Sequence, residues 1–567
     1  MLYKFFRWFA CLAFVFAAVL SPASTVFALS FNVNSTVDEV DANPGDGVCA
    51  TSTGGCSLRA AIQEANATTD DDTITLPSGI YTLSIAGNNE DAAATGDLDI
   101  TSNMVINGTD STNTIIDGNT LDRVFHVVNT DNFATISNVT IQNGNSPDNG
   151  GGILNAGILA VNNSVVRNNF AECTGSAVYN SGGFSSMNST IHENIGGGVF
   201  CLGMAIMNNS EASMLLNQTV ISNNQPDGGL YNYGVIFLFS STIRDNTGGG
   251  FADTPGGIYN FSGFMYINNS TISGNYTSSG GGIFTGGGGE IIIANTTITN
   301  NSADSGGGIY NFPNFPSTVY MRNTILAGNT STSNEPECVG ELISTGYNLI
   351  GNDTGCTFLS TTGDQVGAGS NPIDPMLGLL QNNGGFTETH ALIVGSPAID
   401  GGNPQGCQDP DGNIIETDQR GIPSPQGAAC DIGAFELEEV SDVIVVAIDI
   451  KPGNSRNRIE IEEDDDEKIS VAILSTEQFN AVQQVDRTSL TFGATGDENS
   501  LNLKGRKLIP DCKSKDVNRD RLPDLVCNFK LQSTGFQIGD TEGILKGSTV
   551  DSLLFEGRDV VVIKIDD

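Results

Sequence analysis

One short phrase returns about every 26 residues through the middle of this chain, and it limits the folds that the chain can adopt. The phrase is a Thr-Ile pair followed by an asparagine, as in Thr190-Ile191-His192-Glu193-Asn194 and Thr297-Ile298-Thr299-Asn300. Its aligned aliphatic positions are 141, 166, 191, 220, 243, 272, 298 and 325, with steps of 25, 25, 29, 23, 29, 26 and 27 residues. A second phrase interleaves with it, at Gly152-Ile153, Gly198-Val199, Gly229-Leu230, Gly257-Ile258, Gly282-Ile283 and Gly308-Ile309. Two interleaved signals at one period indicate a stacked array of repeats.

Each repeat is too short and too polar to bury a face alone, so its core must come from stacking on its neighbours. Thr-Ile and Gly-Ile-Tyr-Asn are typical of short strands, with the aliphatic residue inward and the Thr or Tyr outward. Gly and Asn tolerate the positive φ of turns. Leucine-rich repeats need a Leu pattern that is missing, and a propeller needs about 40 or more residues per blade. We therefore predict an all-β fold, a parallel β-helix over residues 97–370, with equivalent asparagines stacked into amide ladders.

The cysteines and the first residues predict a secreted protein. Residues 1–28 resemble a signal peptide, because Lys4 and Arg7 precede an apolar run and Val26-Phe27-Ala28 suits cleavage. No later stretch is apolar and long enough to span a bilayer. Apart from Cys11 in this segment, the chain has ten cysteines. They fall into five pairs of residues that are close in sequence: Cys49/Cys56, Cys173/Cys201, Cys338/Cys356, Cys407/Cys430 and Cys512/Cys527. In a secreted chain these pairs predict five disulfides, and the absence of CxxC or Cys/His spacing argues against metal binding.

The net charge restricts the class of binding partner, and the distribution of lysine along the chain indicates a domain boundary. The formal charge is −41, which disfavours nucleic acid and anionic membranes and favours cations such as calcium, although it also fits simple solubility. After Lys4 no lysine occurs before Lys451, and nine lie from Lys451 onward. This shift predicts a separate C-terminal domain over residues 443–567.

The segment Cys56-Ser57-Leu58-Arg59-Ala60-Ala61-Ile62-Gln63-Glu64-Ala65-Asn66 resembles the CSLREA domain that begins secreted bacterial β-helix proteins, with Ala60 in place of Glu. Physically it predicts a short amphipathic helix that Ser57 caps, with Leu58, Ala61, Ile62 and Ala65 as its apolar stripe. The open end of a stack must be covered. We therefore interpret residues 29–96 as an N-terminal cap. The resemblance implies a right-handed β-helix of the pectin-lyase-like fold.

Residues 371–440 resemble the choice-of-anchor Q domain. The resemblance rests on Asp374-Pro375-Met376-Leu377, Thr389-His390-Ala391-Leu392, Gly395-Ser396-Pro397-Ala398, Asp418-Gln419-Arg420-Gly421 and Cys430-Asp431-Ile432-Gly433-Ala434-Phe435-Glu436. It implies a region that closes the β-helix and precedes a surface anchor. Asp400, Asp418, Arg420, Asp431 and Glu436 fit an acidic catalytic cluster or an arginine-centred ion-pair network. We favour the network, because chemistry also needs a pocket.

The C-terminal domain resembles a β-rich module of secreted bacterial proteins, through Ile448-Asp449-Ile450-Lys451-Pro452-Gly453 and Asp516-Val517-Asn518-Arg519-Asp520. Alternating runs such as Val560 to Ile565 predict a β-sandwich. Asp516, Asn518, Asp520 and Asp524 have the spacing of a calcium loop or of an Asx-rich turn. Arg521 replaces the turn glycine, and Cys527 stands where an EF-hand has its Glu. A calcium ion here would be structural.

Function has two open interpretations, because lyases, hydrolases and adhesins share this fold. The residues after the aligned aliphatic positions are Gln142, Arg167, His192, Ile221, Arg244, Ser273, Thr299 and Leu326, and they are expected to face outward. Arg167, His192 and Arg244, with Glu193 and Asp245, fit a groove for an anionic glycan or a solvated face. We predict a secreted or cell-surface protein that binds polysaccharide or a surface, or has a structural role. The alternative is a polysaccharide lyase or glycoside hydrolase, for which these five residues are the catalytic candidates.

Overall fold

The computed structural model describes residues 28–68, 71–88, 90–128, 130–197, 203–226, 228–249, 256–438, 443–454, 456–461, 467–551 and 553–565. The predicted signal peptide lies outside these residues apart from Ala28, and so do Gly198-Val199 and Cys201. The chain divides between Glu438 and Glu439 into two compact units. None of the described helices has the length and apolar character needed to cross a bilayer.

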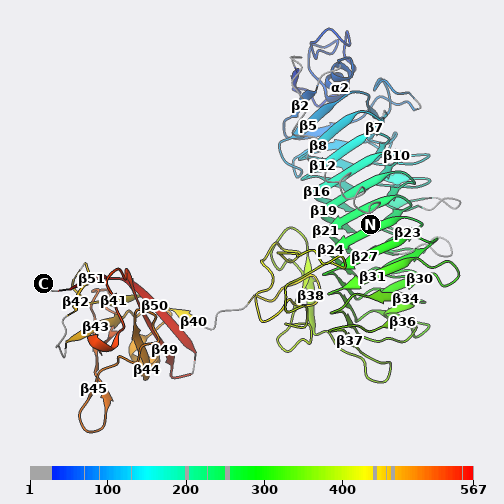
Figure 1. Ribbon diagram of the computed structural model, residues 1–567. Coiled ribbons are helices and arrows are strands. Elements are labelled where there is room, and N and C mark those ends of the chain that lie inside the picture. Colours follow the sequence, from blue (N-terminus) through cyan, green and yellow to red (C-terminus); the bar gives the residue numbers. More distant parts are fainter. Residues whose placement is uncertain are drawn as a thin grey trace. The chain divides into compact units, whose positions relative to one another are not determined.

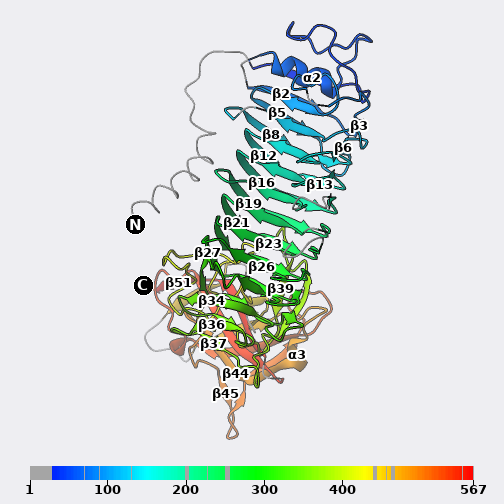
Figure 2. The same ribbon diagram turned by 90° about the vertical axis from the view of Figure 1, so that its right-hand side faces the viewer.

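The first unit is the predicted parallel β-solenoid, in which three stacks of short parallel strands enclose one core (Figures 1 and 2). Stack one contains β1 (Ser30–Asn32), β2 (Asp72–Leu76), β5 (Met104–Gly108), β8 (Phe133–Ser137), β12 (Ile158–Asn162), β16 (Gly183–His192), β19 (Ser213–Ser222), β21 (Val235–Phe239), β24 (Phe264–Asn268), β27 (Glu290–Ala294), β31 (Thr318–Arg322), β34 (Cys338–Ser344) and β36 (Cys356–Leu359).

Stack two contains the ends of β16 and β19 together with β3 (Gly79–Thr82), β6 (Thr114–Asp117), β9 (Thr140–Gln142), β13 (Val165–Arg167), β22 (Thr242–Arg244), β25 (Thr271–Ser273), β28 (Thr297–Thr299), β32 (Ile325–Leu326), β35 (Leu349–Ile350) and β37 (Gln365–Val366). Stack three contains the start of β34 together with β4 (Leu98–Ile100), β7 (Phe125–Val127), β11 (Ile153–Asn155), β15 (Val178–Asn180), β18 (Ile206–Asn208), β20 (Leu230–Asn232), β23 (Ile258–Phe261), β26 (Ile283–Gly286) and β30 (Ile309–Asn311). Two small sheets lie at the corners, β10 (Asn145–Ser146), β14 (Phe170–Ala171) and β17 (Ile195–Gly196) in one and β29 (Ser302–Ala303) and β33 (Thr330–Ser331) in the other.

The predicted register is correct in six of the eight aligned turns and wrong in two. Ile191 pairs with Ile221, and Ile298 pairs with Leu326, so Val220 and Ile325 are one residue out of register. Because strand side chains alternate with period two, Ile221 and Leu326 face the core instead of solvent. The corner residue before each strand explains the shift. It has positive φ and lies three residues before the inward aliphatic residue, at Asn138, Asn163, Asn188, Gln218, Ser240, Asn269, Asn295 and Asn323.

Two buried asparagine ladders run through the solenoid, as the repeat predicted. In one ladder each side-chain amide donates to the side-chain oxygen of the asparagine in the next turn, over 2.9 to 3.0 Å. Its members are Asn169, Asn194, Asn224, Asn246, Asn275, Asn301 and Asn329. The other ladder joins Asn155, Asn180, Asn208, Asn232 and Asn260 over 2.7 to 2.9 Å. These bonds satisfy amides that burial would otherwise leave unpaired.

The helix α2 (Leu58–Asn66) covers the first turn of the solenoid. Ser57 caps it, because its hydroxyl accepts the backbone N–H of Ala60 at 3.0 Å. The predicted apolar stripe, Leu58, Ala61, Ile62 and Ala65, joins the main core. Arg59 is also buried, and its guanidinium binds Asp38 and the carbonyl of Gly96.

Residues 377–438, the flanking region, pack along the side of stack two. They contain the antiparallel pair β38 (Leu377–Gln381) and β39 (Thr389–Leu392). Leu392, Ile432 and Phe435 share a second core with Ile325 and Leu349. The choice-of-anchor Q resemblance implied closure of the β-helix, and this stays a prediction. The contacts of the flanking region extend along stack two from Arg244 in β22 to Gln365 in β37, which donates its side-chain amide to the carbonyl of Pro397 at 2.7 Å.

The second unit has two four-stranded sheets that face one core, which gives the predicted β-sandwich. One sheet contains β40 (Val443–Val445), β50 (Leu554–Val560), β49 (Glu542–Thr549) and β44 (Val485–Gly493), and the other contains β41 (Ile448–Ile450), β43 (Lys468–Ile473), β48 (Asp524–Lys530) and β47 (Cys512–Lys515). The remaining elements are β42 (Arg458–Ile461), β51 (Val562–Ile565), β45 (Leu503–Lys504), β46 (Ile509–Pro510), α3 (Ala481–Gln484) and the 3-10 turn η1 (Leu531–Ser533).

Four of the five predicted disulfides are present among the described residues. They join Cys49 to Cys56, Cys338 to Cys356, Cys407 to Cys430 and Cys512 to Cys527, with Cα–Cα distances of 5.1, 5.1, 5.3 and 4.0 Å. The fifth predicted pair includes Cys201, which lies outside the described residues.

Candidate functional site

The predicted site residues fall on the outer edge of stack two, in one column that we call the strand-end column. Backbone pairing aligns them from turn to turn. The members are Asp117, Gln142, Arg167, His192, Ser222, Arg244, Ser273 and Thr299. Ser222 takes the place predicted for Ile221, because of the corrected register. Arg167 and His192 lie on adjacent turns, whereas Ser222 separates His192 from Arg244.

At its first turns, the column forms a chain of hydrogen bonds. Gln142 donates its side-chain amide to Asp117 Oδ2 at 2.8 Å. Arg167 donates Nε and Nη2 to Gln142 Oε1 at 3.1 and 3.0 Å. Arg167 therefore has a neutral oxygen as its partner, and among the described residues it forms no ion pair with a carboxylate. These three half-buried side chains present polar groups one turn apart.

The two other basic residues carry an acid at the next position. His192 Nδ1 lies 3.4 Å from Glu193 Oε2, and Arg244 Nη1 donates to Asp245 Oδ2 at 2.8 Å. Glu193 and Asp245 adopt φ of 55° and 54°, at a corner where other turns place Asn or Gly. Burial lowers the pKa of His192, and the nearby Arg167 and Arg244 act in the same direction while Glu193 opposes them. The imidazole is therefore neutral near pH 7.

The flanking region covers the later half of the column. Arg244 Nε binds Glu388, and Thr242 donates its hydroxyl to the backbone carbonyl of Glu388 at 2.7 Å. Ser273 lies 2.9 Å from Nε2 of the buried His390. Ser222 is only 2% exposed, so the open part of the column extends from Asp117 to His192.

Aromatic side chains are the usual platforms for stacking against a sugar, and three outward tyrosines lie on stack three. Tyr179, Tyr259 and Tyr310 occupy one outward column together with Met207, Tyr231 and Phe284. Tyr259 stacks on Tyr231 at 4.3 Å and on Phe284 at 4.7 Å, measured between ring centroids. These rings use their faces on one another, so the ladder stabilises the stack and offers few free faces to a sugar.

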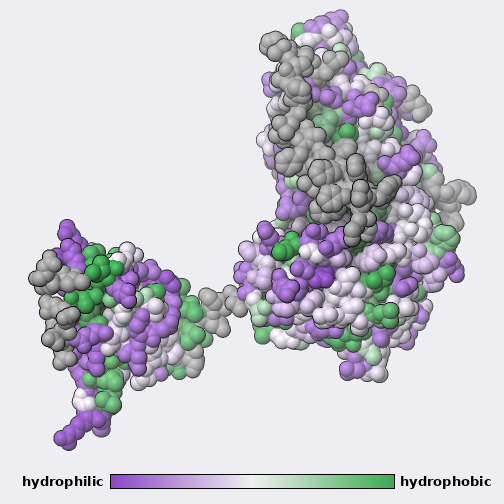
Figure 3. All heavy atoms as spheres, viewed as in Figure 1, coloured by the Kyte–Doolittle hydropathy of each residue, from purple (hydrophilic) through white to green (hydrophobic). Residues whose placement is uncertain are grey.

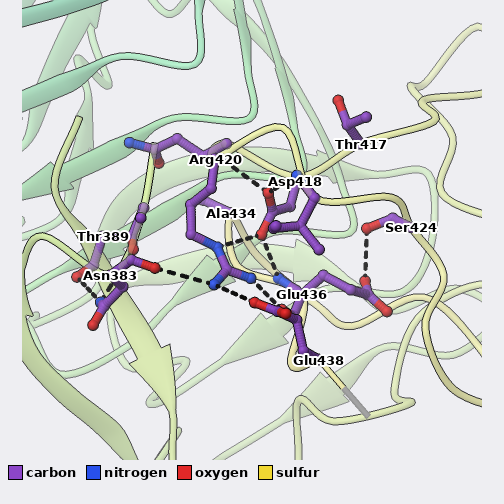
Figure 4. Close-up of polar contacts among 12 residues, drawn as sticks. Asn383, Thr389, Thr417, Asp418, Arg420, Ser424, Ala434, Glu436 and Glu438 are labelled. Atoms are coloured by element: carbon purple, nitrogen blue, oxygen red, sulfur yellow. Dashed lines mark hydrogen bonds and ion pairs between the residues drawn. The ribbon is translucent and has the colours of Figure 1, made fainter. Parts of the chain in front are cut away.

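Arg420 is the centre of the predicted ion-pair network (Figure 4). Its guanidinium donates Nε to Asp418 Oδ2 at 2.8 Å and Nη2 to the carbonyl of Glu436 at 2.5 Å, and it lies 3.7 Å above the Phe435 ring. The side chains of Arg420 and Asp418 are only 4% and 3% exposed. Asp400 and Asp431 bind backbone N–H groups close by. This arrangement holds the flanking region together, and its exposed member is Glu438, whose Oε1 lies 3.4 Å from Arg420 Nη1.

Three of the four predicted calcium ligands lie in the loop before β48, and the fourth, Asp524, is the first residue of that strand. Asp524 is buried and accepts the backbone N–H groups of Ser475 and Val517. Asp516 accepts those of Arg519 and Arg521, and Asn518 and Asp520 accept others within the loop. These bonds match an Asx-rich turn, although each carboxylate retains lone pairs for an ion. A calcium ion at this loop stays a prediction.

Sequence reasoning missed an acidic cluster at the first turns of stack three. His126 Nδ1 lies 3.1 Å from Asp99 Oδ1 and 3.5 Å from Asp91 Oδ1, a spacing that a divalent cation could bridge. Arg123 Nη1 binds Asp97 at 3.1 Å, and burial raises the pKa of Asp97 to about 7. Asp99 and His126 are paired across one repeat of 27 residues, so extending the period toward the N-terminus would have aligned them.

Comparison with known proteins identifies no family. No family model matches the chain, and no curated protein matches it. Among solved structures the chain is similar to the A-module of the mannuronan C-5 epimerase AlgE6 from Azotobacter vinelandii, at 15% sequence identity and a TM-score of 0.32. The match covers 55% of this chain and 91% of that module. Similarity at this level says nothing about the activity of this chain.

Proposed function

We propose that this protein is an extracellular binding solenoid that holds a polysaccharide along the open part of the strand-end column. The observation that carries the proposal is the chain of polar contacts from Asp117 through Gln142 to Arg167. It places hydrogen-bonding groups at every turn, about 4.8 Å apart, which is close to the length of one sugar residue in an extended glycan. The four disulfides fit an extracellular protein.

Net charge and local pairing favour a neutral or weakly charged glycan over a strongly anionic one. The chain carries a formal charge of −41, which repels polyanions at long range. His192 and Arg244 already have acidic neighbours, so among the described cations of the strand-end column only Arg167 has no carboxylate partner. On the face that Figure 3 shows, hydrophilic and intermediate side chains make up much of the described surface of the first unit, and such side chains can hydrogen-bond to a hydroxyl-rich ligand.

A polysaccharide lyase or hydrolase is the second candidate function, and His192 is the observation that favours it. A neutral imidazole whose pKa lies below its ordinary value can accept a proton at neutral pH. Against this, neither the cavity over β8, β12, β16 and β19 nor the cavity at the corner of the first turns is lined by His192, Arg167 or Glu193.

The same proposal includes the identity of two further regions. Residues 29–96 are a CSLREA-like domain, and residues 371–440 are a choice-of-anchor Q-like domain.

A glycan array and affinity electrophoresis with residues 29–567 test the binding proposal. We expect retention by at least one neutral polysaccharide, and about tenfold weaker retention for Gln142→Ala and Arg167→Ala. Arg458→Ala, an exposed arginine in the second unit, is the matched control and should bind normally. Release of reducing or unsaturated ends by the wild type, lost in His192→Ala, would replace binding by catalysis as the function.

A further inference from the structure

The two ends of the solenoid differ in how they are covered (Figures 1 and 2). At the first turn, α2 places four apolar side chains in the main core. At the opposite end, β36 and β37 form the last turn, and each has a strand partner on one side only, β34 and β35 respectively. Among the described residues, no strand pairs with their outer edges. The backbone N–H and C=O groups along these edges therefore form a template for another strand.

The core of the solenoid is also incompletely covered at this end. Phe358 pairs with Leu342, and Val366 pairs with Ile350, in the preceding turn. Leu342 and Ile350 are fully buried in the main core. Phe358 and Val366 are only partly buried, since no further described turn packs on them. A stack of repeats needs a polar capping turn at each end. The last turn therefore leaves apolar surface that another layer of strands would bury.

Covalent and polar contacts hold the last turn in shape, so its outer edge is preformed. The disulfide between Cys338 and Cys356 joins the first residue of β34 to the first residue of β36. Asp364, just before β37, accepts the backbone N–H groups of Asn348 and Thr361 at 2.8 and 2.6 Å. A preformed edge loses little conformational entropy when it pairs with another strand.

The last turn carries little charge, unlike the chain as a whole. Within residues 353–371 the charged side chains are those of Asp353 and Asp364 alone. The formal charge of the whole chain is −41, so two copies repel each other at long range. A nearly uncharged surface is where two such copies can approach with the least repulsion.

A second copy of this chain fits this end by its shape. The interface between successive turns already joins strands of this length around this core, and a second last turn continues that interface with the same strands. The first turn of a second copy is covered by α2, which restricts the pairing to two last turns. A twofold axis perpendicular to the sheet makes the two β36 strands antiparallel and keeps both inner faces on the same side.

We propose that two copies of this protein associate end to end through their last turns, with β36 of one copy paired antiparallel to β36 of the other. Phe358 and Val366 of both copies then share one buried layer. Leu359, which is 78% exposed on the outer face of β36, gains a cross-strand neighbour. The inference goes beyond the proposed function and does not rest on it, because it uses no residue of the strand-end column.

Sedimentation velocity of residues 29–567 over a range of protein concentrations measures the association. We expect a monomer–dimer equilibrium that strengthens between about 0.05 and 0.5 M salt, because salt screens the repulsion between the negatively charged copies. Leu359→Glu places like charges on the two paired strands and should weaken the dimer by about tenfold or more. Leu379→Glu is the matched control, because Leu379 is 82% exposed on β38 and the substitution adds the same charge. It should leave the dimer unchanged.

Hydrogen exchange locates the contact. We expect the backbone amides of residues 356–366 to exchange more slowly as the protein concentration rises, while those of residues 377–381 do not change. A monomer at every concentration would overturn the inference, as would a dimer that Leu359→Glu leaves intact or that Leu379→Glu disrupts. Protection of residues 356–366 that is independent of concentration, or a dimer that added salt weakens, would overturn it as well.

Discussion

The side-chain amide of Asn329 donates to Glu337 Oε2 at 2.7 Å, and this contact ends the longer asparagine ladder. Each ladder member donates toward the next turn, so the last amide needs an acceptor that cannot itself be an asparagine of a further turn. Glu337 also accepts the backbone N–H groups of Gly328 and Asn329, at 3.1 and 3.3 Å. The carboxyl group is buried, and burial raises its pKa to about 7.

Glu337→Gln should remove part of the pH dependence of stability. Because the folded pKa is about 7 and the ordinary value is 4.5, the contribution of Glu337 is fully present below pH 4.5 and is lost as pH rises through 7. The loss is on the order of 3 kcal/mol. We expect the difference in denaturation midpoint between pH 5 and pH 8 to be smaller in Glu337→Gln than in the wild type. Equal differences in both proteins would contradict the raised pKa.

A substitution in the middle of the longer asparagine ladder should lower the free energy of unfolding far more than a substitution of an exposed corner asparagine. Asn246 accepts from the backbone and side chain of Asn224 and donates to Asn275 Oδ1 and the carbonyl of Ile221. Asn246→Ala leaves these buried groups unpaired and should cost about 3 kcal/mol or more. Asn168, exposed with φ of 53°, is the control, because Asn168→Gly keeps the turn and should change stability by about 0.5 kcal/mol or less. Urea denaturation of both variants measures the contrast.

Adjacent substitutions in β19 test the corrected register. Ile221 lies in the core, whereas Val220 aligns with the outward Thr190 and Thr242 of the neighbouring turns. Val220→Thr therefore introduces the residue already present on both sides and should cost less than about 1 kcal/mol. Ile221→Thr places a hydroxyl in the core and should cost about 2–4 kcal/mol. The reverse order would support the register predicted from the sequence.

The period, the inward aliphatic residues and the amide ladders could be predicted because each is a property of one repeat. The register error arose where two aliphatic residues are adjacent, as in Val220-Ile221 and Ile325-Leu326, so hydrophobicity fits both settings. The corner residue decides between them, since Gln218 and Asn323 have the positive φ found three residues before every other inward position. Glutamine is a poor signal for that conformation, and only the pairing of neighbouring turns reveals it.

The packing of the flanking region over the later part of the strand-end column could not be predicted, because these contacts join segments that are far apart in the sequence. Arg244 and Glu388 are 144 residues apart, and Ser273 and His390 are 117 apart. No repeat or motif links these residues, and their contact depends on how the flanking region folds against a finished solenoid. The acidic cluster around His126 was missed for a different reason, because it lies before the turns in which the repeated sequence phrase is easily recognised.

Acid should loosen the flanking region locally. His390 is 2% exposed, its Nδ1 lies 2.7 Å from the carbonyl of Gly378, and its Nε2 lies 2.9 Å from Ser273 Oγ. Burial lowers its pKa, so its contribution to stability is present above pH 6.5 and is lost as pH falls through the folded pKa. This direction is opposite to that of Glu337. Hydrogen exchange should therefore accelerate in residues 377–392 between pH 7 and pH 5, after correction for the intrinsic rate, while the ladder near Asn329 becomes more protected. His390→Gln should abolish the first change and leave the second, and acceleration that persists in this variant would contradict the role of His390.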